Sequence, residues 1–415
     1  MHAILVSVGT DGDVVPYIGL GLCLRQRGHA VTLVASGHYE AKASACGFGF
    51  RALVSEAENH ELFSNPDFWH PLKTAPLAAK WGVRFIERQY RLLSELAATG
   101  DSVLIANPGV LAAGLVHETS GCPLANLVLQ PWMIPSSIAP PVMPMVDLSR
   151  WPRPMVRLFW RALDAVVDRL IGRDLNLIRS RLGLKPARRI LSHWLSPQAV
   201  LGMFPAWYGP PQADWPKAVT LVGFPMFDGG DAAEIPAEVE AFCRGGAPPV
   251  AVTFGTEMMH AENVFRALIE AAATLGVRCV VLTKYRRQLP AELPPSVFHC
   301  GFAPFQKLFP LCSAVVHHGG IGTSAWALAA GTPQRILPFC FDQMDNAARV
   351  ERLGAGLSVR FKPGRLASIE AALKRVLEAD TKATCRQVRE RCTTGPEAFA
   401  ASAGIIEELA ASRGR

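Results

Sequence analysis

The first forty residues contain a pattern that few folds accommodate. An apolar run over residues 2–8 is followed by a glycine-rich segment at 9–16, a helical pattern at 17–27 and a second apolar run at 30–35. A buried strand, a tight loop, a helix and another strand make a β-α-β unit, which requires a parallel sheet. The chain is therefore predicted to be an α/β protein that binds its ligands at the carboxyl ends of the strands.

The same α/β pattern begins again in the second half of the chain. Strands are predicted at 249–254, 278–283, 313–316 and 334–338, and helices at 261–275 and 323–330. An arginine-rich helical stretch at 150–183 and a proline- and glycine-rich stretch at 209–230 separate the two halves. We predict an N-terminal domain at 1–215, a second domain at 216–385, a cleft between them, and a helical tail at 386–415 that packs back on the first domain.

Composition excludes several classes of protein. Half of the 415 residues are apolar and only 19% are charged, which rules out a disordered chain. The net charge of +7 suits anionic ligands or an anionic membrane surface, but no Lys/Arg-rich block indicates nucleic-acid binding. The ten cysteines form no C-x-x-C pair and are interpreted as core residues in a reducing, cytoplasmic compartment. No signal peptide is expected, because the chain starts with a strand.

A charge-free segment at 119–146 resembles a membrane span in hydropathy alone. It contains six prolines, which a regular spanning helix does not accommodate. We interpret it as a strand followed by a long apolar loop.

The segment from His317 to Thr323 leaves a strand and opens a helix. A helix N-terminus offers free N–H groups, and the glycines at 319, 320 and 322 let the backbone approach an anion closely. With donors from His318 and Thr323, the turn is suited to a diphosphate, whose charge develops as it leaves a sugar. The alternative is an ordinary strand-to-helix turn.

Two further strand ends carry polar residues. Gly255-Thr256 follows the strand at 249–254 and can donate to a phosphate, or it is a simple turn. Asp342-Gln343 combines acceptors and donors that suit sugar hydroxyls. For Asp342, the alternative is the N-cap of the helix predicted at 346–353.

Asp13 is the candidate general base, because it lies in the first loop after a strand and an acceptor hydroxyl needs a positioned base. Two alternatives stay open: Asp11 and Asp13 form a D-x-D metal motif, or Asp13 caps the following helix. A dinucleotide reductase is disfavoured, because the first loop lacks G-x-G-x-x-G and the second strand is not followed by an acidic residue.

These residues resemble the GT-B glycosyltransferases, the large family of sterol, antibiotic and plant natural-product glucosyltransferases. The resemblance covers nearly the whole chain. It is carried by the donor signature that starts at His317 and continues through Gly331-Thr-Pro-Gln334 and Pro338-Phe-Cys-Phe-Asp-Gln343, and by Gly12-Asp-Val-Val-Pro16.

The resemblance implies a fold and a set of roles. Two Rossmann-like domains would face each other across a cleft, the first binding the acceptor and the second the nucleotide sugar, in an inverting reaction without a metal or other cofactor. Asp13 takes the catalytic position. The implied donor contacts are Thr256, Phe302, Ala303, His318, Gly320, Gly322, Thr323, Asp342 and Gln343.

One departure from the family pattern concerns the nucleotide. Many UDP-sugar members have a Glu that binds the ribose hydroxyls where this chain has Trp326. A deoxyribose donor, such as a dTDP-sugar, loses less by this change.

A finer likeness connects the segments 1–5, 196–207 and 210–229 with the rhamnosyltransferases of rhamnolipid biosynthesis. It implies transfer of L-rhamnose from dTDP-rhamnose to a 3-(3-hydroxyalkanoyloxy)alkanoate. The alternative is a UDP-sugar-dependent glucosyltransferase for a sterol-like or other natural-product hydroxyl.

A lipid acceptor requires an apolar wall. The candidates are Trp132, Met133, Ile134 and Met143, which otherwise pack within their own domain. The arginine-rich stretch would rest on the inner membrane face or be a solvated surface, and a partner enzyme would supply the acceptor. A nucleotide-binding module without transfer activity and an epimerase acting on the donor alone remain open.

Overall fold

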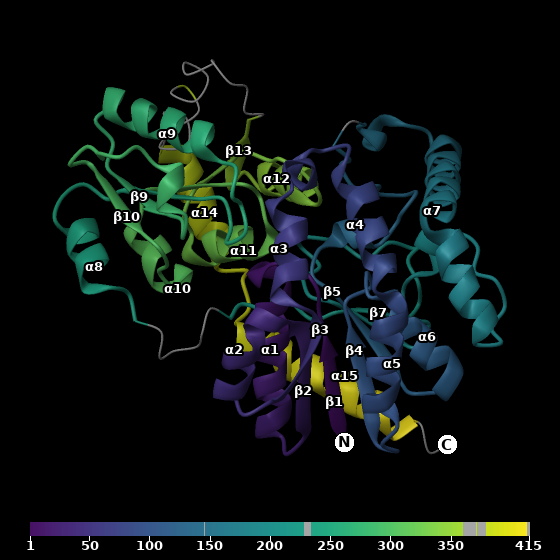
Figure 1. Ribbon diagram of the computed structural model, residues 1–415. Coiled ribbons are helices and arrows are strands. Elements are labelled where there is room, and N and C mark those ends of the chain that lie inside the picture. Colours follow the sequence, from purple (N-terminus) through teal and green to yellow (C-terminus); the bar gives the residue numbers. More distant parts are fainter. Residues whose placement is uncertain (145, 228–233, 360–370, 372–378, 413–415) are drawn as a thin grey trace. The chain divides into compact units, whose positions relative to one another are not determined.

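The computed structural model describes residues 1–144, 146–227, 234–359, 371 and 379–412. The chain divides into two compact units, which Figure 1 labels by element. The first comprises residues 1–225 together with 393–415, and the second comprises residues 226–392. Each unit has its own parallel sheet, so the two-domain α/β class predicted from the sequence is confirmed.

The first unit is built on a seven-stranded sheet with the order β3-β2-β1-β4-β5-β6-β7, in which all paired strands are parallel. Its strands are β1 (His2–Val6), β2 (Ala30–Ser36), β3 (Gly49–Val54), β4 (Ser102–Ala106), β5 (Leu124–Val128), β6 (Ala199–Gly202) and β7 (Val219–Leu221). Because β1, β4 and β5 are neighbours, the segments that follow them emerge at one edge of the sheet.

Helices connect these strands. They are α1 (Asp11–Gln26), α2 (Glu40–Ala45), α3 (Glu56–Ser64), α4 (Thr74–Arg84), α5 (Ile86–Ala97), α6 (Leu111–Ser120) and α7 (Arg153–Arg181). Short 3-10 turns lie at Gly37–Tyr39, Pro66–Trp69, Pro131–Met133, Leu148–Arg150 and η5 (Ile190–His193).

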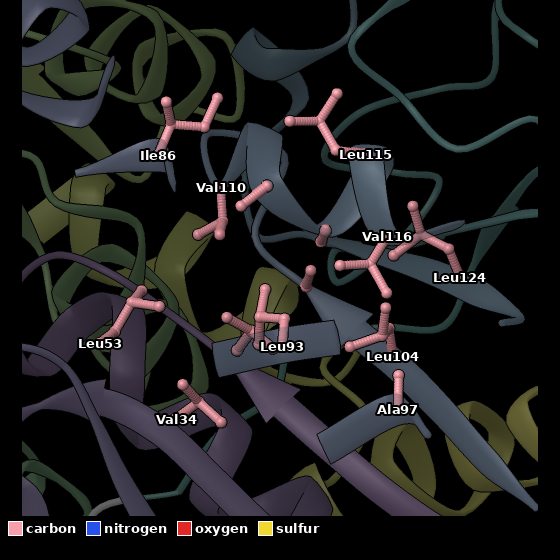
Figure 2. Close-up of a cluster of buried hydrophobic side chains, with 14 of the residues drawn as sticks. Val34, Leu53, Ile86, Leu93, Ala97, Leu104, Val110, Leu115, Val116 and Leu124 are labelled. Carbon is pink, nitrogen blue, oxygen red and sulfur yellow. The ribbon is translucent and has the colours of Figure 1, made fainter. Parts of the chain in front are cut away.

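The core of the first unit lies between the sheet and the helices α5 and α6. Figure 2 shows Leu93 and Ala97 of α5 and Val116 of α6 pointing toward Leu104 of β4. These four side chains are at most 3% exposed. Strands that are buried on both faces have apolar residues at successive positions, which is why they could be predicted from the sequence.

The C-terminal helix α15 (Gly395–Ala411) belongs to the first unit, where it packs against α1. Glu407 of α15 accepts hydrogen bonds from Arg27 at 2.8 Å and pairs with the His29 ring at 2.7 Å. The chain thus returns to the first unit at Thr393, after the second unit is complete.

The second unit has a six-stranded parallel sheet, ordered β10-β9-β8-β11-β12-β13 among the described residues. The strands are β8 (Val250–Thr253), β9 (Cys279–Leu282), β10 (Val297–Cys300), β11 (Ala314–His317), β12 (Gln334–Ile336) and β13 (Gly356–Ser358). The helices are α8 (Ala237–Arg244), α9 (Glu262–Thr274), α10 (Phe305–Leu308), α11 (Ile321–Ala330), α12 (Gln343–Arg352) and α14 (Ala379–Arg389). Two 3-10 turns lie at Arg286–Gln288 and Phe309–Leu311.

The structure corrects two local predictions. The segment 9–16 is not a loop throughout, because α1 begins at Asp11 and includes Pro16. Thr10 is the N-cap and Asp13 occupies the third helical position, so the polar residues of this segment start the helix earlier than its apolar spacing indicated. Similarly, α12 begins at Gln343, three residues before the predicted start.

The charge-free segment is a strand, β5, followed by an irregular stretch containing the turn Pro131–Met133. This agrees with the prediction of a strand and loop. Within the described residues, no helix combines the length and apolar character needed to cross a bilayer.

Candidate functional site

Asp13 is placed by the turn between β1 and α1. Its Oδ2 atom accepts hydrogen bonds from the Thr10 backbone N–H at 2.9 Å and from the Thr10 hydroxyl at 3.2 Å. Gly9 has φ +123°, and a Cβ there would lie 2.2 Å from Oδ2, so only glycine leaves room for the carboxylate. The helix-capping role therefore coexists with a carboxylate held in one fixed position.

The surroundings of Asp13 tune its proton affinity. Burial raises the pKa of this carboxyl to about 6, against the opposing effect of the two Thr10 hydrogen bonds. Such a group is mostly ionised at neutral pH yet far more basic than an exposed aspartate. This is the protonation behaviour required of a general base.

Asp11 is turned to a different partner. Its Oδ1 accepts a hydrogen bond from the Tyr39 hydroxyl at 2.8 Å. Within the described residues, no group of three or more His, Cys, Asp or Glu side chains gathers in a metal-binding arrangement.

The apolar candidates follow β5, two strands from β1 on the same sheet edge. Met133 and Ile134 are 8% and 1% exposed and belong to the core of the first unit. Trp132 and Met143 are partly exposed, and the indole N–H of Trp132 is buried without a hydrogen-bond partner among the described residues. The segment thus divides into an inward-packed pair and two residues with accessible surface.

In the second unit, the glycine-rich turn joins β11 to α11. Gly320 is the N-cap of α11, so the N–H groups of the first helical turn have no helical acceptors. Thr323 lies in that turn and is 8% exposed. Gly319 has φ +94°, and a Cβ there would come within 2.8 Å of Ile336. The turn is therefore tightly fitted and presents donors at a helix N-terminus, where anions bind favourably.

His318 lies between two glycines of adjacent strand ends. A Cβ at Gly320 would lie 2.6 Å from its Nε2 atom, and one at Gly255 would lie 3.2 Å from its Cε1 atom. Burial lowers the pKa of His318 to about 4, with the Thr253 backbone acting in the opposite direction. Its Nδ1 atom is buried and makes no hydrogen bond within the described chain. At neutral pH this imidazole is an uncharged hydrogen-bonding group with unused capacity.

Residues that sequence reasoning did not assign hold this turn in place. His317 is fully buried; its Nδ1 accepts the Gly319 N–H at 3.1 Å, and its Nε2 bonds to Gln334 Oε1 at 2.9 Å. Burial, reinforced by the neighbouring His318 ring, lowers the pKa of His317 to about 3. This geometry requires the neutral tautomer that carries its proton on Nε2.

Asn346 of α12 connects the turn to the second predicted contact. Its side-chain amide donates to the Gly319 carbonyl at 2.9 Å and to Asp342 Oδ2 at 2.6 Å. The residue is fully buried. The Asp-Asn pair at 345–346 in the signature run was the available sequence signal, but only the tertiary contacts reveal what Asn346 does.

Asp342 and Gln343 are brought to the same strand edge, at the start of α12. Asp342 is 9% exposed, and Gln343 is 4% exposed. The Gln343 Oε1 atom accepts the backbone N–H groups of Phe339 and Cys340 at 2.7 and 3.1 Å. The side-chain oxygen of Gln343 is thus engaged in shaping its own loop. Its amide nitrogen also donates to Cys340 Sγ at 3.9 Å, which leaves one amide N–H for a ligand.

The remaining predicted donor residues follow β8 and β10. Thr256 comes after Gly255 (φ +89°), and the adjacent Glu257 forms an ion pair with Lys284 at 2.8 Å. Phe302 is 61% exposed, whereas Ala303 is fully buried. The structure therefore gathers the predicted donor residues of the second unit at the carboxyl ends of β8, β10, β11 and β12.

Comparison with known families places both halves of the chain in one class of enzymes. Residues 3–137 match the glycosyltransferase family 28 N-terminal domain. Residues 266–409 match the C-terminal domain of erythromycin biosynthesis protein CIII-like proteins. These matches identify the chain as a glycosyltransferase.

Two curated relatives illustrate the range of this family. The chain is 29% identical over 430 residues to an uncharacterized glycosyltransferase of Mycobacterium tuberculosis, covering 99% of both chains. It is 27% identical over 378 residues to a sterol 3-beta-glucosyltransferase of Candida albicans, covering 86% of this chain. This chain matches only 24% of the length of that fungal glucosyltransferase.

Solved GT-B structures share the fold. The spinosyn rhamnosyltransferase SpnG superposes with a TM-score of 0.69 at 19% identity, covering 99% of each chain. The glycosyltransferase VinC in complex with dTDP superposes with a TM-score of 0.69 at 18% identity, covering 99% of this chain and 100% of the other. At these identities the likeness concerns the fold.

Trp326 of this glycosyltransferase lies on α11. It is partly buried and packs against the core cluster that contains Ala303, Phe309 and Ala327. At the position that holds a ribose-binding Glu in many UDP-sugar members, this chain therefore has an apolar side chain that packs on the core.

Proposed function

We propose that this glycosyltransferase moves L-rhamnose from dTDP-rhamnose to the hydroxyl of a lipid acceptor such as a 3-(3-hydroxyalkanoyloxy)alkanoate. The reaction is an inverting single displacement that needs no metal. The observation that carries transfer from a nucleotide sugar is the His318 turn, a ring with an unused nitrogen beside a glycine-capped helix N-terminus.

The donor is bound by the second unit. The free N–H groups of α11, the Thr323 hydroxyl and His318 hold the diphosphate, with Thr256 as a further donor. Neutral His318 contributes a hydrogen bond rather than a charge, since its pKa is about 4 in the unliganded protein. Asp342 and the Gln343 amide contact the sugar hydroxyls, and the exposed Phe302 ring and the Ala303 backbone meet the base.

Asp13 accepts the proton of the acceptor hydroxyl. The oxygen then attacks the anomeric carbon from the face opposite the nucleotide, and the bond from that carbon to the diphosphate breaks. The leaving diphosphate takes the bonding electrons, and the contacts that hold it stabilise the charge it gains. Trp132 and Met143, with Met133 and Ile134 behind them, form the apolar side of the acceptor site.

Trp326 supports a deoxyribose donor. An apolar core residue at this position offers no acceptor for a ribose 2′-hydroxyl, so a dTDP-sugar loses less binding than a UDP-sugar. Two proteins of similar fold support this choice: one is named a spinosyn rhamnosyltransferase, and VinC was solved in complex with dTDP.

A second candidate is a UDP-sugar-dependent glucosyltransferase for a sterol-like or other natural-product hydroxyl. The similarity to the fungal sterol 3-beta-glucosyltransferase favours it. The two candidates differ in both nucleotide and acceptor, so the same assay separates them.

The test is a thermal-shift panel of dTDP- and UDP-sugars, followed by turnover with a hydroxy-ester lipid and with a sterol. We expect dTDP-rhamnose to give the largest shift and rhamnose to appear on the hydroxy-ester, with a chelator leaving the rate unchanged. Preferential binding of UDP-glucose with transfer to the sterol would establish the second candidate. Conversion of the donor alone would indicate an epimerase, and binding without turnover a nucleotide-binding module.

A further inference from the structure

Large apolar side chains are unevenly distributed on the surface of this protein. Seven are prominently exposed in the described residues, and five of them lie on α7 or directly before it. These five are Trp151, Met155, Leu158, Val166 and Leu177, which are 39–65% exposed. The remaining two, Leu72 and Phe302, lie on other segments. A concentration of this kind on one helix is unlike the scattered exposed apolar residues of an ordinary surface.

The four exposed apolar residues within α7 lie on its outer side. Met155, Val166 and Leu177 are spaced by eleven residues, close to three helical turns, and therefore align along the helix axis. Leu158 lies one turn from Met155. The opposite side of α7 is buried through residues such as Val156 and Ile171, where the helix packs against α4 and η5. Figure 1 shows α7 at the margin of the first unit, beside α4.

Positive charge accompanies this face. Five arginines of α7 form no ion pair in the described part of the chain: Arg153, Arg157, Arg161, Arg169 and Arg173. Two of the three aspartates of the helix are turned inward. Asp164 bonds to Ser192 and Asp168 to the backbone of Arg189 and Ile190. By helical spacing, Arg169 and Arg173 lie on the same side of α7 as Met155 and Val166. Arg157 and Arg161 instead line a hollow together with Ser136, Ser137 and Asp214. The outer face of α7 is therefore apolar and carries two of the five arginines.

A helix of this composition does not cross a bilayer. It has 29 residues, but apolar and charged positions alternate along it, so it lacks the long apolar stretch that a membrane span requires. An exposed apolar face flanked by arginines, with a tryptophan at its beginning, is typical of helices that lie in the plane of a membrane interface. Arginine side chains then reach the lipid phosphates, while the apolar side chains enter the boundary of the acyl chains.

We propose that the outer face of α7, together with Trp151, docks this glycosyltransferase on the surface of an anionic phospholipid membrane. The exposed apolar side chains insert into the membrane, and the arginines that form no ion pair favour lipids with negatively charged headgroups. The proposal does not depend on the identity of the donor or acceptor, because none of the residues assigned to transfer lies on α7. It gives the enzyme access to a lipid-dissolved acceptor without a membrane-spanning segment.

The first test measures sedimentation of the full chain with vesicles. We expect binding to vesicles containing phosphatidylglycerol and little binding to vesicles of phosphatidylcholine alone. The double variant Met155→Ser/Leu158→Ser should lower the partition coefficient by about a hundredfold, since each buried side chain contributes roughly tenfold. Leu72→Ser is the matched control: Leu72 is 57% exposed and Leu158 65%, but Leu72 lies outside the docking face.

The second test concerns charge. Arg169→Gln/Arg173→Gln should weaken binding to the anionic vesicles by about twenty-five-fold, because each arginine near such a surface contributes on the order of fivefold. The control Arg266→Gln/Arg386→Gln removes the same charge from exposed positions of the second unit and should leave binding unchanged. Added salt should reduce the effect of the arginines and not that of the apolar residues.

Three outcomes would overturn the proposal. These are equal affinity for both kinds of vesicle, no vesicle binding at all, and a dimer in light scattering that Met155→Ser/Leu158→Ser converts to a monomer. The last would identify a second copy as the occupant of this face. Transfer to a water-soluble acceptor analogue is measured in parallel and should be the same in all variants, so loss of membrane binding is separable from failure of the proposed transfer reaction.

Discussion

The turn after β1 and the turn after β11 have the same topology, but the groups that they place at the helix N-terminus differ. Each leaves a parallel strand, relies on glycines with positive φ, and opens a helix. The first uses the helix N-terminus to hold a carboxylate of the chain itself, Asp13. The second leaves its helix N-terminus without a carboxylate and packs a neutral imidazole, His318, between glycines.

Burial acts on both groups, but the consequences differ at neutral pH. Burial raises the pKa of Asp13 to about 6, which leaves most of the carboxylate ionised and able to accept a proton. It lowers the pKa of His318 to about 4, which leaves the ring uncharged. One turn is therefore suited to proton transfer and the other to anion binding. The side chain in the first helical turn therefore decides whether the shared scaffold supplies a base or binds a ligand's negative charge.

The largest effect is expected from Asp13→Asn. Removal of a general base should reduce kcat by about 10²–10⁴-fold while the donor dissociation constant stays within a factor of two. Because Asn also removes a carboxylate that burial destabilises, the variant should unfold at the same or a higher temperature at pH 7. Asp11→Asn, which alters the neighbouring carboxylate bound to Tyr39, is the control and should keep most activity. An equally severe loss of donor binding in Asp13→Asn would contradict the base role.

A smaller but still large effect is expected from Gly320→Ala in the second turn. The added methyl group would meet His318 Nε2 at 2.6 Å, so the ring must move and donor affinity should fall by about tenfold to a hundredfold. Gly322→Ala is the matched control, since its Cβ would meet nothing within 4 Å. Its melting temperature should be unchanged, and any loss of donor affinity there would report close approach of the phosphate. Calorimetric titration with the donor and thermal unfolding measure both effects, and undiminished affinity in Gly320→Ala would count against the His318 turn as the diphosphate site.

The two turns should respond differently to pH: the first through kcat/KM and the second through the stability of the fold. As pH falls through about 6, protonation of Asp13 should lower kcat/KM by up to tenfold per pH unit. Donor binding should not follow this limb. For stability, His318 favours the neutral form in the folded state, so acidification between its unfolded pKa of about 6.5 and its folded value of about 4 lowers its contribution to stability. The raised pKa of Asp13 contributes in the opposite direction below about pH 6. A flat kcat/KM from pH 5 to 8 would remove Asp13 from the mechanism.

The smallest effect is expected from Thr10→Ala. The substitution removes the hydroxyl that donates to Asp13 Oδ2 at 3.2 Å. Because this hydrogen bond lowers the pKa of the Asp13 carboxyl, its removal should raise that pKa. The acid limb of kcat/KM should therefore move to higher pH, whereas the rate at pH 8 changes little. Thr10→Ser keeps the donor and should retain the wild-type limb. A shifted limb in both variants would show that the hydroxyl is not the cause.

Prediction from sequence was most successful where the chain is buried or glycine-rich. Runs such as those of β1 and β4 identified the parallel sheets, because strands covered on both faces have apolar residues at successive positions. The strand-to-helix turn around His318 was predicted correctly, because glycines between an apolar run and a helical pattern indicate a tight connection. Its role in binding a diphosphate stays a prediction. The start of α1 was missed, since apolar spacing does not register the capping contacts of Thr10 and Asp13.

Two α/β units, a carboxylate after the first strand and a glycine turn after β11 were all predictable from the amino-acid sequence. Local spacing suffices for these features, because strand, turn and helix are neighbours along the chain. Three-dimensional contacts were needed to reveal that Asn346 connects Gly319 with Asp342 and that α7 exposes its apolar side. These features depend on contacts between residues far apart in the chain and on which face of a helix is covered, and neither is recorded in local spacing.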